Sequence, residues 1–460
     1  MARCGALLLT LAAWPLASKT LREFGVSAAT GRVQGLVLMF GSLYAFGAGA
    51  LLTPDVALQF FWLLVLHEAA IALTRDERRW LSAGVATGLG ILGKYIMVLI
   101  GPALLVGLMA KKGSLRRPWP YAGALACLLT ITPHLAWNHK NDWVTWRFQL
   151  GHGLHGSHEG AGGSGPPVPV VGAPKPESRE WQLAQYFLAA ESPAKPRPVK
   201  SEVAKLGQRL GDFGGAVFGL WGLMMVPLLI AIKRWRVPIS QRWVAPELGA
   251  LAVAATLVPL FVFGGISFFQ AIEANWPAVY LIGASLCIAR VAARIPGLSV
   301  AAFGNGLLVV TLALYAKNPF PLKLPGQDRA LAETHGYQAL GAVLKGIGAG
   351  LYAETYQLTA MAHLYGVTAV TQFPGLTRPS EFTRRQALAK DFKLSSGFWL
   401  VKNGMVPPTI HGYTAVSLTE LRDCLSGFYK TRSGATPFYS PPCKDVIHRW
   451  FLVEYIEAAG

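Results

Sequence analysis

Apolar runs long enough to cross a bilayer fill most of the first 316 residues. The run at 81–110 exceeds the roughly 20 residues of a single crossing. We therefore expect it to form two crossings that turn at Gly93-Lys94-Tyr95. The pattern predicts a polytopic α-helical membrane protein with about ten spans. The apolar runs are 4–18, 33–51, 56–73, 81–110, 120–137, 214–232, 245–264, 276–293 and 299–316.

The turns between these runs alternate between two kinds. Short turns rich in Lys and Arg stay on the cytoplasmic side of a membrane, so the turns of the other kind are expected to face the exoplasm. The second kind carries the polar sequences at 53–55, 137–143 and 273–277. We therefore expect the chemistry of the protein on the exoplasmic face. The basic turns contain Lys19, Arg22 and Arg32; Arg75, Arg78 and Arg79; Lys111, Lys112, Arg116 and Arg117; Lys233, Arg234, Arg236 and Arg242; and Arg290 and Arg294.

The first run is short for a span and allows two interpretations. Arg3, the apolar run from Gly5 to Leu16 and the small pair Ala17-Ser18 match a cleaved signal peptide. Cleavage there would place the basic residues that follow outside, against the charge rule. If the run is a span instead, we expect the chain to begin partway through a longer protein.

From residue 317 onward the pattern changes to that of a folded exoplasmic domain. Short apolar stretches typical of strands alternate with amphipathic stretches typical of helices, and this alternation favours a small α/β domain. We thus expect a transmembrane domain over 1–316, with an exoplasmic loop at 138–213, and an α/β domain over 317–460. The expected strands are 349–353, 367–372 and 397–401, and the expected helices are 356–365, 379–392 and 418–428.

Two segments outside the spans invite a prediction about cysteine or metal chemistry. Cys424 and Cys443 lie in the same exoplasmic segment, where disulfides persist, and we predict a disulfide between them although spacing alone does not decide it. His152, His155 and His158 suggest a metal site, but they stand in a Gly-, Pro- and Ser-rich stretch typical of a solvated loop. A divalent metal thus stays open as a cofactor, without assigned ligands.

The composition supports a membrane protein and argues against nucleic acid. Hydrophobic residues make up 52% of the chain and charged residues 14%, well below the roughly 25% charged residues of a soluble domain. The formal net charge is +18. Much of this surplus lies in the basic turns, where membrane topology and anionic lipid head groups explain it.

Three polar positions near or within apolar runs each allow a functional and a plainer interpretation. Asp55 could belong to a site, but the local sequence favours a helix cap. Lys94 is costly inside an apolar run, so it is either functional or reaches the membrane surface with its long side chain. His67-Glu68 suggests a proton relay, and an interhelical hydrogen bond is the simpler alternative.

Several of these sequences together resemble glycosyltransferase family 39, a family of transferases that use polyprenyl-phosphate sugars. The family includes protein mannosyltransferases and aminoarabinose transferases, and the resemblance implies a GT-C-like fold. It extends over most of the chain, although each motif is short. The motifs are Leu52-Thr53-Pro54-Asp55, the Gly-rich stretch from Gly88 to Tyr95, Trp137-Asn138 with Trp143, Arg147 to Gly151, Asn275-Trp276-Pro277-Ala278, and Leu351 to Leu358.

The resemblance implies transfer of a sugar from a polyprenyl-phosphate donor in the bilayer to a hydroxyl of a glycan, lipid or protein. Such a reaction needs a carboxylate base for the hydroxyl and cations or a metal for the departing phosphate. Asp55 is the candidate catalytic carboxylate and Lys94 the candidate phosphate ligand. The candidate residues of the sugar and acceptor pocket are Asn138, Trp143, Glu273, Asn275 and Trp276.

One departure from the family keeps other functions open. The family carries an acidic pair in its first exoplasmic loop, and nothing comparable precedes the run at Gly5. The alternatives are therefore a truncated, non-catalytic family member or a transporter or flippase of another class. The expected location is the bacterial inner membrane with the C-terminal domain in the periplasm; an endoplasmic reticulum membrane fits the same pattern.

Overall fold

The structure, a computed structural model, divides into two compact units. The first contains residues 1–143 and 199–311, and the second contains 144–198 and 312–460. The described residues are 4–51, 53–141, 143, 145–146, 202–234, 245–317, 331, 334–348, 350–377, 380, 382–383, 386, 394–404, 406–424, 427–432 and 446–458. The His152, His155 and His158 loop lies outside them.

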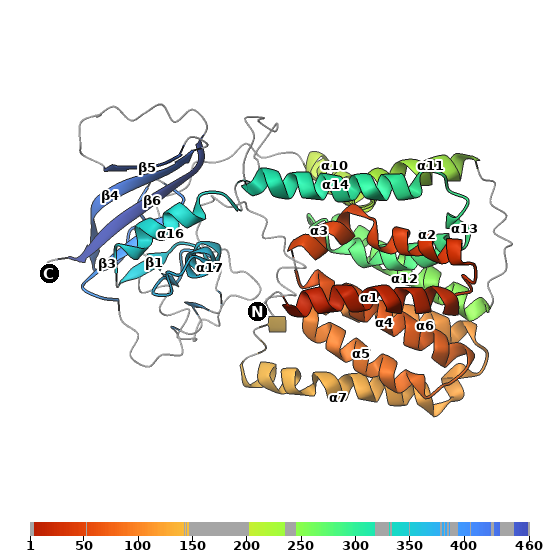
Figure 1. Cartoon of the computed structure of the whole chain (residues 1–460). Coiled ribbons are helices and arrows are strands. Elements are labelled where there is room, and N and C mark those ends of the chain that lie inside the picture. The colour runs from red at the N-terminus through yellow and green to blue at the C-terminus, as the bar shows by residue number, and fades with distance from the viewer. Residues whose placement is uncertain are drawn as a thin grey trace. The chain divides into compact units, whose positions relative to one another are not determined.

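The first unit is helical (Figure 1). Short 3-10 turns interrupt or join its α-helices: η1 Tyr95–Leu99, η2 Ser114–Arg116, η3 Gly222–Met224 and η4 Pro277–Val279. The α-helices are α1 Cys4–Glu23, α2 Ala29–Phe40, α3 Leu43–Leu51, α4 Asp55–Thr74, α5 Arg79–Gly93, α6 Ile100–Ala110, α7 Pro118–Lys140, α10 Glu202–Gly219, α11 Met225–Arg234, α12 Pro246–Ser267, α13 Tyr280–Ala292 and α14 Leu298–Lys317.

Several helices are long and apolar enough to cross a membrane. Among the described residues these are α1, α4, α12 and the segment Leu298–Tyr315 of α14, with the bent pair α10–α11 as a fifth if it forms one span. The helical membrane architecture is thus supported, whereas the expected count of about ten spans stays a prediction. α1 continues past Ser18 to Glu23, so the helix is longer than the predicted run at 4–18.

Two predicted spans are wrong as single helices. The run at 33–51 is broken at Gly41, where an added Cβ would lie 2.5 Å from both the Ala302 Cβ and the backbone oxygen of Val37. The run at 214–232 is bent by 85° between α10 and α11. Gly222 occupies this bend with a φ of +61°, a conformation that glycine adopts without a steric penalty. Continuous hydrophobicity therefore did not reveal breaks that glycine makes possible.

The predicted turn in the run at 81–110 is confirmed. α5 ends at Gly93, Lys94 is extended with φ −158° and ψ 127°, and η1 and α6 follow. This break places Lys94 at the end of α5 rather than within a helix.

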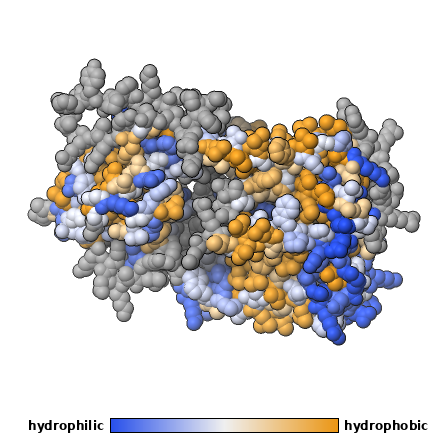
Figure 2. All heavy atoms as spheres, viewed as in Figure 1, coloured by the Kyte–Doolittle hydropathy of each residue, from blue (hydrophilic) through white to orange (hydrophobic). Residues whose placement is uncertain are grey.

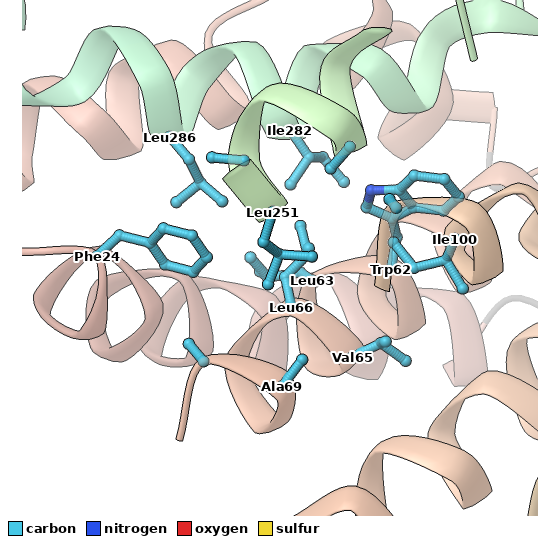
Figure 3. Packing of buried hydrophobic residues seen from close by; sticks show 14 of the residues in the cluster. Phe24, Trp62, Leu63, Val65, Leu66, Ala69, Ile100, Leu251, Ile282 and Leu286 are labelled. Carbon is cyan, nitrogen blue, oxygen red and sulfur yellow. The ribbon is translucent and has the colours of Figure 1, made fainter. Parts of the chain in front are cut away.

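The core of the helical unit forms around α4. Trp62 and Leu66 of this helix are fully buried and belong to one cluster with Leu251 of α12 and Leu286 of α13. Figure 3 shows Leu66, Leu251 and Leu286 gathered in this core. Because burial of apolar surface fixes α4 on several sides, the polar residues at its two ends are held on a rigid element.

Ion pairs bring three basic turns to one end of the helical unit. Arg75, directly after α4, pairs with Glu23 at the end of α1. The Glu77 Oε1 atom lies 3.8 Å from the Nζ of Lys111 and 3.9 Å from the Nε of Arg117, which flank the connection between α6 and α7. Figure 2 shows hydrophilic residues gathered at one end of this unit.

Polar turns of the second kind lie at the opposite end. α4 has 20 residues and is therefore about 30 Å long, with Asp55 as its first residue. α5 runs antiparallel to α4, because Arg79 pairs with Glu68 and Lys94 pairs with Asp55. The fold thus reproduces the alternation of these turns, while the membrane face that each end occupies stays a prediction. Glu68 also accepts a hydrogen bond from Ser82, as the simpler interpretation of His67-Glu68 expected.

The second unit contains a mixed sheet with strand order β2-β1-β3-β6-β4-β5. β1 is parallel to β2 and β3, and the remaining pairs are antiparallel. Its α-helices include α16 Tyr337–Lys345 and α17 Tyr356–Leu364. The strands are β1 Leu351–Ala353, β2 Thr371–Gln372, β3 Gly397–Lys402, β4 Tyr413–Cys424, β5 Gly427–Arg432 and β6 Val446–Glu457.

The central strand β3 is buried on both faces. Leu340 of α16 and Leu358 of α17 pack with Val401 of β3 on one face. Phe398, also on β3, belongs to an aromatic cluster with Tyr455 on the other face. Successive strand residues point to opposite faces, so one strand supplies both clusters.

The strand and helix predictions for this unit are partly correct. The described residues contain strands that overlap the ranges 349–353, 367–372 and 397–401 and a helix within 356–365. The helix predicted at 418–428 is wrong, because these residues belong to β4 and β5. Thr419, Leu421 and Asp423 are buried at a spacing of two, and pairing with β6 outweighs the helix-like spacing of the leucines. Most of the helix predicted at 379–392 lies outside the described residues.

The structure describes only one of the two cysteines of the predicted disulfide. Cys424 is buried at the end of β4 and is disulfide-bonded. Cys443 lies outside the described residues, so the pairing of these two cysteines stays a prediction. Cys4, Cys127 and Cys287 are free.

Close backbone contact between α5 and α7 generates a test of the fold. A Cβ on Gly84 would lie 1.9 Å from the backbone oxygen of Gly123, whereas a Cβ on Gly101 of α6 meets nothing within 4 Å. We expect Gly84→Ala to destabilise the helical unit by about 1–3 kcal/mol relative to Gly101→Ala, because the helices must separate. Both changes bring the same gain in helix propensity. Thermal unfolding in detergent measures the difference, and equal midpoints would contradict this packing.

Candidate functional site

The carboxylate of Asp55 accepts hydrogen bonds from four side chains. Oδ1 accepts from the Lys94 ammonium at 2.5 Å and from the Tyr44 hydroxyl at 3.0 Å. Oδ2 accepts from Thr53 Oγ1 at 3.1 Å and from Asn275 Nδ2 at 3.3 Å. A carboxylate offers about four lone-pair positions, so these donors occupy all of them. We call Asp55 and these four donors the Asp55 cluster.

The Asp55 cluster joins segments that are distant in the sequence. Asp55 opens α4 directly after Pro54, Lys94 lies at the break after α5, and Tyr44 comes from α3. Asn275 lies in the connection between α12 and η4, 220 residues from Asp55. Because α4 is fixed in the core, its first residue serves as the fixed point to which the other segments bind.

The preference for a plain helix cap at Asp55 is not borne out. In the described part of the chain, the hydrogen-bond partners of its carboxylate are side chains rather than the backbone N–H groups of the first turn. Its position at the N-terminus of α4 still suits a negative charge, because the helix dipole is positive there. Asp55 is 4% exposed, and a carboxylate so deeply buried depends on these partners.

Lys94 is paired rather than merely directed at the surface. Its side chain is 21% exposed and its ammonium lies 2.5 Å from Asp55 Oδ1. Removing one partner of such a buried pair costs about 3–5 kcal/mol, since the other charge is left uncompensated. The partial exposure leaves the ammonium within reach of a ligand that approaches this end of the unit.

The predicted pocket residues of the 273–277 turn divide between two environments. Asn275 belongs to the Asp55 cluster. The ring centroid of Trp276 lies 5.9 Å from the ring centroid of Phe263. Glu273 is exposed, and its carboxylate makes no hydrogen bond or ion pair with another residue in the described ranges. The turn therefore presents an amide inside the site and a carboxylate at the surface.

Asn138 and Trp143 lie in a neighbouring group and not on Asp55. Asn138 is fully buried, and its Nδ2 atom lies 2.9 Å from Nε2 of His134. The same His134 nitrogen lies 2.5 Å from the hydroxyl of Tyr95, the residue after Lys94. Trp143 is 42% exposed, and its backbone N–H donates a hydrogen bond to the backbone carbonyl oxygen of Asn138 at 2.7 Å. The break at residues 94–95 thus connects the two groups.

Sequence reasoning missed two members of these groups. Tyr44 and His134 each lie within an apolar run and were not singled out. A polar group there needs a partner, and this requirement is the signal that could have drawn attention to them. It would not have identified Asp55 as the partner of Tyr44, because that depends on how α3 packs.

A further buried polar group lies in the second unit. The Nδ1 atom of His335 lies 2.8 Å from Asp423 Oδ2. Burial raises the pKa of Asp423, an effect that His335 opposes, and burial lowers the pKa of His448 to about 4. His448 stacks on Trp450 with ring centroids 4.4 Å apart. Asp423 is buried on β4 and His448 stacks within the sheet, and we assign the group a structural role.

The described residues do not assemble a recognisable metal centre. Within them, no three side chains of His, Cys, Asp or Glu lie close enough together to hold an ion. The carboxylate oxygens of Asp55 already accept four hydrogen bonds. We therefore derive no step from a metal.

A protein-family model matches part of the chain. The family model of dolichyl-phosphate-mannose-protein mannosyltransferases matches residues 2–137, less than a third of the chain. This region includes Asp55 and Lys94 but not Asn275. No curated protein and no solved structure matches the chain. The predicted resemblance to glycosyltransferase family 39 is thus confirmed over residues 2–137, where the chain is similar to membrane glycosyltransferases of the mannosyltransferase type.

Proposed function

We propose that the protein transfers a sugar from a polyprenyl-phosphate donor to an acceptor hydroxyl at the exoplasmic face of a membrane. The observation that carries this proposal is the Lys94 ammonium, which Asp55 holds at the end of the helical unit opposite the basic turns. A donor with an isoprenoid chain stays in the bilayer, so its phosphate meets the protein at a membrane surface. The matched family, whose description includes a sugar joined to a lipid phosphate, supports the same class of donor.

The proposed chemistry makes one bond and breaks one bond. The acceptor oxygen bonds to the anomeric carbon of the sugar, while the bond from that carbon to the phosphate oxygen breaks. The lipid phosphate leaves with the bonding electron pair, and its growing negative charge is stabilised by the Lys94 ammonium. The proton of the acceptor hydroxyl passes to a carboxylate.

The contacts of Asp55 favour a positioning role over that of the base. Four hydrogen bonds occupy all of its lone-pair positions. One of these hydrogen bonds would therefore have to break before Asp55 could accept a proton. We propose that it fixes Lys94 and Asn275 instead. Glu273, two residues before Asn275, is the exposed carboxylate of the same turn, and we assign it the proton.

The location follows from the charge distribution. The basic turns around Arg75, Lys111 and Arg117 meet at one end of the helical unit, and such turns stay in the cytoplasm. We therefore place the Asp55 cluster on the exoplasmic side. A bacterial inner membrane, with the C-terminal domain in the periplasm, is the proposed setting.

Labelling of single cysteines tests this orientation. Lys140→Cys lies at the end of α7 and Lys112→Cys lies in the basic turn before it, and both positions are exposed. With the free cysteines Cys4, Cys127 and Cys287 replaced by Ser, we expect an impermeant maleimide to label the position 140 variant in intact cells. The position 112 variant should react only after lysis. The reverse pattern would contradict the proposed orientation.

Turnover of site variants tests the proposed reaction. We expect Asp55→Asn and Lys94→Met each to lower transfer by about 100-fold or more, because the charge that stabilises the leaving phosphate is misplaced or lost. Glu273→Gln should lower kcat more than it raises KM, since it removes the proton acceptor. Release of polyprenyl phosphate in liposomes, from donors that carry mannose or aminoarabinose, is the measurement.

Glu68→Gln is the matched control for these variants. It disrupts another carboxylate–cation contact between α4 and α5, with Arg79 Nη1 at 3.3 Å, towards the other end of the same helices. We expect turnover within a few-fold of the unaltered chain, and unfolding midpoints measured in parallel separate folding from chemistry. Equal losses in all variants would reject the assignment of the site. No transfer by the unaltered chain would favour the non-catalytic alternative, and transport without transfer would favour the transporter.

A further inference from the structure

A polar cavity lies at the basic end of the helical unit. It has a volume of about 430 Å³ and is lined by Lys19, Arg22, Glu23, His67 and Arg75. These residues come from the last turns of α1 and from the C-terminal half of α4 with the residue that follows it. The Arg75 side chain is 59% exposed, so solutes can reach the rim. We call these five residues the basic cavity.

The basic cavity holds more positive charge than its own residues neutralise. Arg75 pairs with Glu23. In the described part of the chain, Lys19 and Arg22 form no ion pair, so two cations are left over. Helix C-termini carry partial negative charge, which helps to hold cations here but falls short of two full charges. The cavity therefore attracts an anion.

One buried nitrogen atom beside this cavity points to a ligand. The Nδ1 atom of His67 is inaccessible to solvent and has no hydrogen-bond partner among the residues that the structure describes. Such atoms are uncommon in folded proteins and call for an explanation. The His67 ring lines the cavity. After a small rotation of the ring, a ligand in the cavity can form a hydrogen bond with this nitrogen.

We propose that the basic cavity binds a phosphate group. Two neighbouring cations of different kinds suit this ligand: guanidinium groups form paired hydrogen bonds with phosphate oxygens, and ammonium groups act as point charges. The Arg75–Glu23 pair orients a further guanidinium at the rim. The phosphate belongs either to the head group of an anionic phospholipid or to a free phosphate in solution. This site is independent of the proposed transferase reaction, because it lies at the opposite end of α4.

Binding measurements on the purified chain in nanodiscs test the proposal and separate the two sources. Inorganic phosphate is titrated calorimetrically in discs of phosphatidylcholine, and retention of phosphatidic acid is measured by native mass spectrometry. The test variant is Lys19→Gln combined with Arg22→Gln. Its matched control is Lys112→Gln combined with Arg116→Gln, which removes one Lys and one Arg exposed in another turn at the same end.

We expect the test variant to bind the phosphate probe at least about 10-fold more weakly and the control to bind unchanged. His67→Phe, which keeps a ring without the nitrogen, should weaken binding as well. Binding of inorganic phosphate identifies free phosphate as a sufficient ligand, and binding of the lipid alone identifies the head group. Equal losses in test and control variants would reveal only a diffuse basic surface and would overturn the proposal. Absence of binding by both probes would overturn it too. Unfolding midpoints confirm that each variant is folded.

Discussion

A charge buried in an apolar helical unit has to be compensated, and this constraint governs the arrangement around Asp55. Leaving the carboxylate unpaired would cost several kcal/mol, on the order of the whole stability of a domain. Its compensation requires a cation, which Lys94 supplies at the break between α5 and η1. Besides Tyr44 of α3, three separate segments contact the Asp55 carboxylate: the break after α5, the residues before α4 and the 273–277 turn.

The same constraint explains why the site needs more of the chain than the region that resembles the mannosyltransferase family. Asp55 and Lys94 lie within the matched residues 2–137, but Asn275 lies far beyond them. Without Asn275, the donors Lys94, Tyr44 and Thr53 would leave one position of the carboxylate unoccupied. The connection between α12 and α13 therefore completes the site, and the sugar pocket proposed around Trp276 depends on where that connection is held.

Much of the helical unit could be predicted because its signals are local. The ends of α4, the break at Lys94 and the basic turns follow from apolar length, an interrupting cation and clustered charge. The bends at Gly41 and Gly222 could not, because each depends on what packs against the glycine. The same limit applies to β4, where pairing with β6 overrides the local pattern. Asp55, Lys94 and Asn275 could be named from the sequence, whereas the sharing of one carboxylate by four donors requires the packed helices.

The most direct test is a cryo-electron microscopy map of the chain in nanodiscs with polyprenyl phosphate bound. The central claim is that Asp55 holds Lys94 where the phosphate of a lipid donor departs. The predicted result is phosphate density in contact with the Lys94 ammonium, with Asp55 still joining Lys94 to Asn275. Phosphate density found only away from Lys94, or a Lys94 side chain separated from Asp55, would contradict that claim.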